Sequence, residues 1–298
     1  ADAEMPLAHI LRGYFFKLLQ SAKSHERACK SLEDIKRLAA DATMREQGHA
    51  AALEAWCNDD LPEAVRLWDA ILVDHPRDYV AVKLSQYGHF YQGDSANVLD
   101  TVGRCLHAWS PDDPLYPSLL GLLAFGLEES GAYGEAERTG KEAVRLDPED
   151  PWSIHAVAHV FEMQDRHAEG VAWITGLEQH WDRSNNFRYH LWWHRALMHL
   201  GLGETDFVIE HNRFEMLFPS GREFLFAPVV EQVPLPLWKA ILGKTSDPKK
   251  TFYRFMTAID TYHQGRVMCS EVRAGLIRIR KPGAPSTSPV DAFWPEFP

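Results

Sequence analysis

Small and apolar residues recur at the same spacing in three segments of the chain, with polar and acidic residues between them. The segments are LPEAVRLWDAILVDHP (61–76), GAYGEAERTGKEAVRLDP (131–148) and DRHAEGVAWITGLEQHW (165–181). In each, a small residue, a residue four positions later and one three positions after that share one helix face. The first two segments then reach proline five residues further on. This pattern is typical of the second helix of a tetratricopeptide repeat and the turn that ends it.

The distances between these segments support one register. The distance from Ala136 to Gly170 equals one tetratricopeptide repeat, which is about 34 residues long, and Val98 follows Ala64 by the same distance. The intervals from Val98 to Ala136 and from Gly170 to Val208 are each longer by four positions. We therefore expect four extra residues in two connections, at PDDP and at DRSN.

This register predicts an all-α, right-handed solenoid of tetratricopeptide-like helix pairs over residues 1–222. Five pairs are expected at about 45–78, 79–112, 117–150, 151–184 and 189–222, after a sixth formed by AEMPLAHILRGYFFKLLQ and SLEDIKRLAADA. At the close-packing place of the first helices stand Ala52, Ala124, Ala158 and Ala196, with Gln86 as the poor fit. Residues 223–298 are expected to form a divergent segment, a helical cap followed by an irregular tail rich in Pro and Ser.

Composition narrows the class of protein. With 298 residues and 45% hydrophobic content, the chain can bury a sizeable core. It has neither an apolar run of 18 residues nor a signal-peptide pattern, so we expect a cytoplasmic protein without a membrane span. The net charge of −11 argues against nucleic-acid binding. The sequence begins with Ala1, within a stretch typical of the middle of a helical protein. We therefore allow for further residues before Ala1.

The four cysteines give no motif. Cys29, Cys57, Cys105 and Cys269 are far apart in the sequence, form no CxxC and lie mostly on helical patterns. Such cysteines usually act as small buried hydrophobes, so we expect no disulfide.

Histidine is concentrated in one part of the chain. Seven of the 15 histidines fall between His155 and His199. Residues four apart share a helix face, so His155 lies over His159, with Glu162 one turn on, and His190 lies over His194. Any specific chemistry is expected here, whereas His167, His180, His199 and His211 are expected to be structural or solvated.

Three segments carry a family resemblance: DAILVDHPRDYVAVKLSQYGHFYQGD, GLLAFGLEESGAYGEAERTGKEAVRLDPEDPWSIHAVAHVFEMQ and YHLWWHRALMHL. Together they resemble the tetratricopeptide repeat protein 38 family. The resemblance covers roughly residues 1–205 and is most specific in HAVAHVFEM and HLWWH. It implies an α-helical repeat fold and brings no activity with it. Family members are longer, with more helical repeats where this chain has residues 206–298.

In a stacked-pair solenoid the first helices line a concave wall, the usual binding surface. The register places the two histidine pairs and Glu162 on that wall, together with His49, Lys83, Tyr87 and Glu128. Trp193 either fills the core or forms part of the wall.

Two main hypotheses follow. In the first, His49, Lys83, Tyr87, Glu128, Trp193 and the histidines recognise a peptide or small molecule without chemistry. In the second, His155, His159, His190 and His194 bind a transition metal such as Zn or Fe, because imidazoles spaced by four residues can reach one ion. The protein would then be a hydrolase or lyase with His155, His159 and Glu162 as catalytic residues and Glu162 or Glu128 as base.

A third hypothesis is a passive assembly scaffold that binds partners on its outer faces, and a homodimer is left open. The sequence contains no GxSxG motif and no GxGxxG or GxxxxGK[ST] phosphate loop, so neither a serine nucleophile nor a nucleotide has support.

Overall fold

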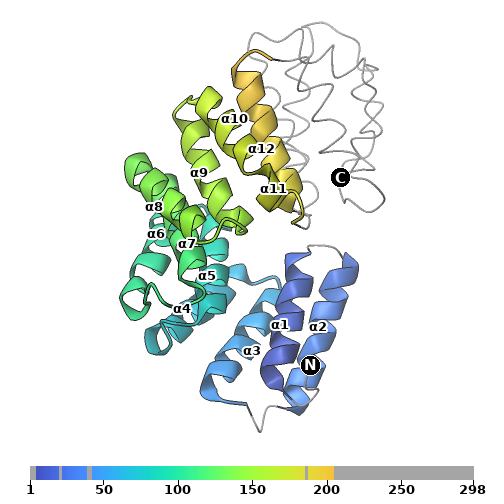
Figure 1. Ribbon diagram of the computed structural model, residues 1–298. Coiled ribbons are helices and arrows are strands. Elements are labelled where there is room, and N and C mark those ends of the chain that lie inside the picture. The colour runs from blue at the N-terminus through green and yellow to red at the C-terminus, as the bar shows by residue number, and fades with distance from the viewer. Residues whose placement is uncertain (1–4, 20–21, 39–41, 185–186, 205–298) are drawn as a thin grey trace, which may run out of the picture. The chain divides into compact units, whose positions relative to one another are not determined.

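The computed structural model describes residues 5–19, 22–38, 42–184 and 187–204, and within these ranges every regular element is a helix (Figure 1). The chain divides into two compact units, residues 1–160 and residues 161–298, and the boundary falls within one helix. The predicted pair partner at 206–222, the predicted boundary at residue 222, the segment 223–298, Val208 and His211 lie outside the described residues. No helix of the described part is long and apolar enough to cross a bilayer.

In the first unit, each helix packs against the one that follows it, from α3 to α8. The helices that lie wholly or mostly in this unit are α1 (Pro6–Leu18), α2 (Ala22–Arg37), α3 (Met44–Cys57), α4 (Leu61–Asp74), α5 (Tyr79–Tyr91), α6 (Ser95–Gly103), α7 (Tyr116–Glu129), α8 (Tyr133–Leu146) and α9 (Pro151–Met163). A short 3₁₀ turn, η2 (Leu106–Ala108), follows α6. The three blue helices α1, α2 and α3 lie side by side (Figure 1). This packing of sequence neighbours is consistent with a helical repeat.

The described part of the second unit begins with the last turn of α9. It continues with α10 (His167–Gly176), α11 (Glu178–Trp181) and α12 (Phe187–Gly201), and α12 packs against α10. Gly170 allows this contact, because a Cβ at that position would collide with the Met198 sulfur.

The backbone turns follow the predicted register. Asp59, Gly93, Gly131, Asp165 and Gly203 all have positive φ, and each follows the first helix of a pair. Their separations alternate between one repeat length and a length four positions greater, the same intervals as those of the apolar pattern. A left-handed residue is a common way to end a helix. The same turn therefore recurs after α3, α5, α7, α9 and α12, and the extra residues lie between Gly93 and Gly131 and between Asp165 and Gly203.

Side-chain caps explain where several helices begin. Thr43 and Glu46 form a capping box at the start of α3. Asp60, Asp78 and Asp94 each accept a hydrogen bond from a backbone N–H in the first turn of the next helix. Such caps satisfy amide groups that have no partner within the helix.

The predicted close-packing alanines are fully buried, at Ala52, Ala124, Ala158 and Ala196. Gln86, the poor fit, is also buried, and its side-chain amide donates to Val98 O at 3.0 Å and to Leu122 O at 2.8 Å. It therefore joins α5 to α6 and α7 by hydrogen bonds where an alanine would make only van der Waals contact.

One prediction needs correction. The second helix of the first pair begins at Ala22, not near Ser31. Its buried face consists of Ser24, Ala28, Ser31 and Ile35. Two of these are serines, so the hydrophobic pattern was too weak to show the helix start.

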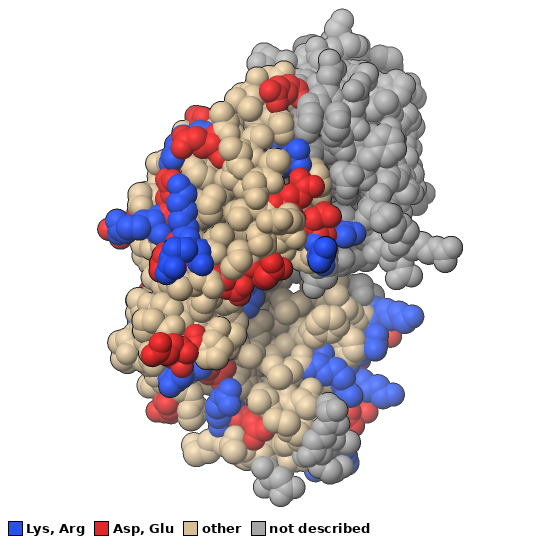
Figure 2. Space-filling model, in the orientation of Figure 1, with Lys and Arg blue, Asp and Glu red and all other residues tan. Residues whose placement is uncertain are grey.

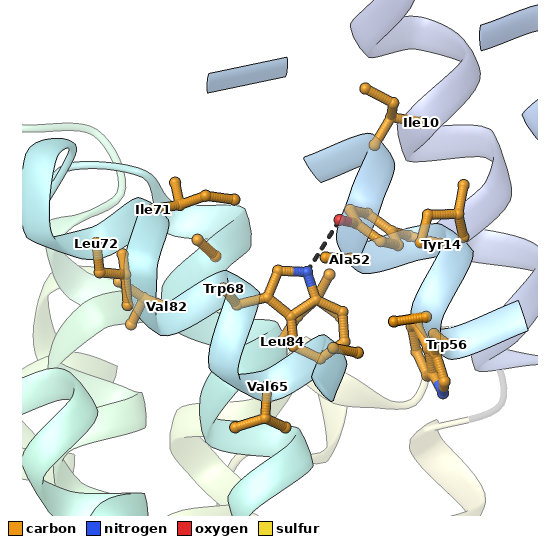
Figure 3. Close-up of a cluster of buried hydrophobic side chains, with 14 of the residues drawn as sticks. Ile10, Tyr14, Ala52, Trp56, Val65, Trp68, Ile71, Leu72, Val82 and Leu84 are labelled. Atoms are coloured by element: carbon orange, nitrogen blue, oxygen red, sulfur yellow. Dashed lines mark hydrogen bonds between the residues drawn. The ribbon is translucent and has the colours of Figure 1, made fainter. Parts of the chain in front are cut away.

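The core of the first unit is centred on Trp68, which is fully buried (Figure 3). Its indole N–H donates to the Tyr14 hydroxyl at 2.9 Å, and that hydroxyl donates to His49 O at 2.8 Å. Burial raises the pKa of Tyr14, so the phenol stays neutral. The outer surface carries interspersed basic and acidic side chains (Figure 2), with pairs such as Arg66 and Glu63.

Candidate metal centre

In the first unit, polar and aromatic side chains of α7 and α9 form a series of contacts. His155 and His159, four residues apart on α9, face each other with Nε2 atoms 2.8 Å apart. His155 is buried, and His159 is about one-fifth exposed. The two side chains share one helix face, as predicted, and their rings meet edge-on with planes 70° apart.

The other nitrogen of His159 faces a carboxylate on α7. Its Nδ1 lies 3.4 Å from Oε2 of Glu128. Glu128 is buried, and its Oε2 has no hydrogen bond from any residue of the described ranges. A buried carboxylate oxygen in this position favours a proton on the facing nitrogen, which leaves the lone pair of His159 on Nε2.

A second carboxylate lies beside the first. Glu128, Glu129 and His159 each offer a ligand atom, and the three atoms lie within 4.8 Å of one another. Burial, and then the negative charge of Glu128, raise the pKa of Glu129, while His159 opposes the shift. A cation bound by both carboxylates would relieve the repulsion between their charges.

Aromatic side chains enclose the histidines within the first unit. Phe125 stacks on His155, with ring centroids 5.9 Å apart and planes 28° apart, and meets His159 edge-on. Trp152 lies 5.2 Å from His155 between ring centroids, and the Lys83 ammonium lies 4.3 Å from the Trp152 ring. Burial lowers the pKa of Lys83 to about 8, although the charge of Asp150 opposes the shift.

The second histidine pair lies on α12 in the second unit. Nε2 of His190 and Nε2 of His194 are 3.2 Å apart, and Trp193 stacks on His190 with ring centroids 4.9 Å apart. Trp193 therefore packs against the imidazole pair. The separation between two nitrogen ligands of a tetrahedral zinc ion is about 3.3 Å, given Zn–N bonds of about 2.0–2.1 Å. Each pair thus presents two nitrogens at or near the spacing that a metal ion needs.

Glu162, predicted as a catalytic base, lies one turn beyond His159 on α9. In the second unit its carboxylate oxygen is 3.9 Å from Nδ1 of His167. His167 is buried, as is His199, whose Nδ1 lies 2.5 Å from the Glu204 carboxylate. The carboxylates beside His167 and His199 fit the structural roles expected for these two histidines.

His49 occupies a different setting from the other predicted ligand-binding residues. It is fully buried; its Nε2 lies 2.8 Å from Asp78, and its Nδ1 lies 3.1 Å from the Tyr14 hydroxyl. Burial alone would raise the pKa of Asp78, but hydrogen bonds from His49 and Arg45 outweigh it and lower that pKa. His49 is thus part of the packing around Trp68, and we leave it out of the candidate site.

Tyr87 also packs inward, with its ring 4.4 Å from that of Tyr91 between centroids and 6.1 Å from that of Trp56. Its hydrophobic contacts belong to the core cluster of the first unit.

The sequence did not single out Glu129 or Phe125. A signal for Glu129 was present, because Glu128 and Glu129 are the last two residues of α7. Acidic residues are unfavourable at a helix C-terminus, so two in succession indicate a role other than helix stability.

The chain matches no family model. The resemblance to the tetratricopeptide repeat protein 38 family therefore stays a prediction from the sequence.

Proposed function

We propose that this chain is a tetratricopeptide-like repeat protein that holds a divalent transition metal ion at its His/Glu cluster and uses the ion to bind a peptide or small molecule. The observation that carries the proposal is the double contact of His159. One ring nitrogen faces His155, and the other faces the buried Glu128 carboxylate.

This arrangement suits a metal ligand. Histidines that bind metals usually direct their second nitrogen to a carboxylate, which fixes the ring and raises its basicity. With Glu128 on Nδ1, the Nε2 atoms of His159 and His155 are available to one ion. A side-chain adjustment of about 0.5 Å would bring them from 2.8 Å to the spacing of zinc ligands.

The charges of the cluster also favour a cation. Glu128 and Glu129 lie together in a partly buried setting, and the pKa of Glu129 is raised for that reason. A divalent ion would remove their repulsion. Imidazole with carboxylate favours Zn or Fe over Mg or Ca, which prefer oxygen ligands alone.

Lys83 suits the binding of an anionic group on the ligand. Its ammonium lies over the Trp152 ring, and the attraction of Asp150 does not offset the effect of burial on its pKa. A ligand carboxylate, such as a peptide terminus, would supply a further charge partner.

A second candidate function is metal-assisted hydrolysis. The position of Glu129 favours it, because its carboxylate lies within 4.8 Å of the ligand atoms of Glu128 and His159. The ion would make bound water more acidic, and Glu129 would accept its proton. Catalytic roles for His155, His159 and Glu162 stay predictions.

The sequence also predicts that His190 and His194 contribute to the same ion, and metal counting tests this. The full chain, purified without a histidine tag or chelator, is analysed by elemental mass spectrometry. We expect about one transition-metal ion per chain, lost in His155→Ala/His159→Ala and equally lost in His190→Ala/His194→Ala. Two ions, with one lost in each double variant, would mean separate sites.

A matched control uses two exposed histidines outside the cluster, in the variant His75→Ala/His107→Ala. This variant should keep its metal. Equal loss of metal from the control, or no metal in the wild type after incubation with Zn²⁺ and desalting, would refute the proposal.

A further inference from the structure

Two neighbouring aromatic side chains at the end of α5 are exposed. Phe90 and Tyr91 are each 41% exposed, and their rings contact each other with centroids 5.6 Å apart. A hydrophobic side chain that is exposed singly is normal in a soluble protein and needs no explanation. Exposed aromatic rings in contact with each other are instead typical of a surface that binds a partner.

These rings continue into aromatic contacts with two further helices of the first unit. Phe90 meets the buried Phe125 of α7 at 5.4 Å between centroids, and Phe125 meets Trp152 of α9 at 5.5 Å. Trp152 is partly exposed. We call Tyr91, Phe90, Phe125 and Trp152 the aromatic strip. It has partly exposed rings at both ends and a buried ring between them.

The rings of the aromatic strip are inclined to one another. The planes of Tyr91 and Phe90 are 88° apart, those of Phe90 and Phe125 are 59° apart, and those of Phe125 and Trp152 are 60° apart. Flat ligands such as nucleobases stack on the face of a ring, and a row of them needs rings of similar orientation. Inclined rings form ridges and hollows instead. Aromatic surfaces of this kind recognise the polyproline II helix, whose side chains project in three directions.

The spacing of the aromatic strip also fits a polyproline II helix. Prolines three residues apart lie about 9 Å from each other, because this helix rises about 3.1 Å per residue. Phe90 and Trp152 both contact Phe125, so their centroids are separated by no more than the two contact distances together. Each of the two outer rings can therefore contact one proline of a Pro-x-x-Pro segment.

A lysine lies at the Trp152 end of the aromatic strip. The Lys83 ammonium is 4.3 Å from the centroid of the Trp152 ring, and it forms no ion pair with a residue of the described ranges. Burial lowers the pKa of Lys83 to about 8, which means that its charge is poorly compensated. A carboxylate on a bound peptide would provide that compensation.

We propose that the aromatic strip binds an extended proline-rich peptide in the polyproline II conformation, with an acidic residue of the peptide beside Lys83. This peptide class suits a short row of rings, because its preformed conformation lowers the entropy cost of binding. The inference deepens the proposed function and rests on its claim that this part of the first unit binds a ligand. It does not require the metal ion.

The experiment measures binding of a panel of fluorescein-labelled synthetic peptides to the full chain by fluorescence anisotropy. Each peptide has the pattern Pro-x-x-Pro-x-x-Pro followed by Glu, with a different residue at x, and each has a counterpart with alanine in place of proline. We expect the best proline peptide to bind at least tenfold more tightly than its alanine counterpart.

Three variants assign the binding to the aromatic strip. Phe90→Leu should weaken binding of the best peptide at least tenfold, while circular dichroism shows that the chain is still folded. Phe15→Leu is the matched control, because Phe15 is 57% exposed on α1 and lies outside the strip, and it should bind like the wild type. Lys83→Met should abolish the preference for the peptide ending in Glu over the same peptide ending in Gln.

Repeating the measurements after removal of metal by a chelator separates this inference from the metal centre. Peptide binding that persists without metal and is weakened by Phe90→Leu supports the aromatic strip even if metal counting fails. Peptide binding that needs metal and is unchanged in Phe90→Leu overturns the inference and leaves the metal centre standing. The inference is also overturned if no proline peptide binds more tightly than its alanine counterpart. A wild-type dimer that dissociates in Phe90→Leu would likewise overturn it, because a second copy of the chain would then cover the strip.

Discussion

His155 and His159 lie with their Nε2 atoms 2.8 Å apart, which is a hydrogen-bond distance. One Nε2 must therefore carry the hydrogen and donate it in the hydrogen bond, and the other must accept. Two protonated rings could not keep this contact. The two nitrogens therefore face each other close to the spacing at which both could bind one metal ion. The Glu128 carboxylate at 3.4 Å from Nδ1 of His159 favours the tautomer that directs a lone pair toward His155.

Removing the charge of Glu128 should weaken metal binding without unfolding the protein. We expect Glu128→Gln to reduce the affinity for Zn²⁺ by about 10–100-fold, because partners of metal-bound histidines typically have effects of this size. Competition with a chromophoric chelator measures the affinity. Glu135→Gln, at an exposed position on α8, is the control. Equal affinities for the wild type and Glu128→Gln would contradict this role of Glu128.

Glu129 should destabilise the metal-free protein at neutral pH. Its pKa is raised in the folded state, so folding becomes less favourable as pH rises through that value. Glu129→Gln should therefore melt at a higher temperature than the wild type at pH 7, and the difference should shrink toward pH 4. Saturating Zn²⁺ should reverse the order, because only the wild type offers both carboxylates. An unchanged order with Zn²⁺ would argue against a role in metal binding.

The effect of Lys83 on the stability of the folded protein has the opposite dependence on pH. Its pKa is lowered to about 8 from an unfolded value of about 10.4, so the unfolded chain binds more protons between these values and stability rises with pH there. Lys83→Met should stabilise the protein by about 1–2 kcal/mol at pH 7, with the gain lost by pH 10.5. Denaturant unfolding at pH 7 and pH 10.5 measures this change in the free energy of unfolding. Lys141→Met, at an exposed position, is the control. A constant difference between pH 7 and pH 10.5 would mean that burial of charge is not the cause.

His49 should contribute to the stability of the folded protein rather than to metal binding. His49→Ala removes hydrogen bonds to Asp78 and Tyr14 and leaves a buried carboxylate with one partner fewer. We expect a loss of about 2–4 kcal/mol in the free energy of unfolding, measured by urea denaturation. Metal content should not change. Loss of metal from a His49→Ala protein that stays folded would return His49 to the candidate site.

Most of the helix pairing could be predicted from the sequence, because the turns and the apolar positions repeat together. The residues Asp59, Gly93 and Gly131 mark turns in phase with the buried small residues. Gln86 was recognised as an exception, but its two hydrogen bonds depend on carbonyls of α6 and α7 that only the fold places nearby.

The candidate site was predictable only in part. Helix periodicity was sufficient to pair His155 with His159, since both lie on one helix. It could not show that Glu128 on α7 contacts His159, or that His49 is directed into the core. These contacts depend on the rotation and depth of neighbouring helices, which a periodic pattern leaves undefined.

Titration of the metal-free chain with Co²⁺, followed by visible absorption, tests the central claim most directly. We expect one equivalent of Co²⁺ to give the bands of a four- or five-coordinate nitrogen and oxygen site, without thiolate charge transfer, and His155→Ala/His159→Ala to abolish them. A strong thiolate band would assign the metal to cysteine. A spectrum no different from that of hydrated Co²⁺ would contradict a metal centre at His155 and His159.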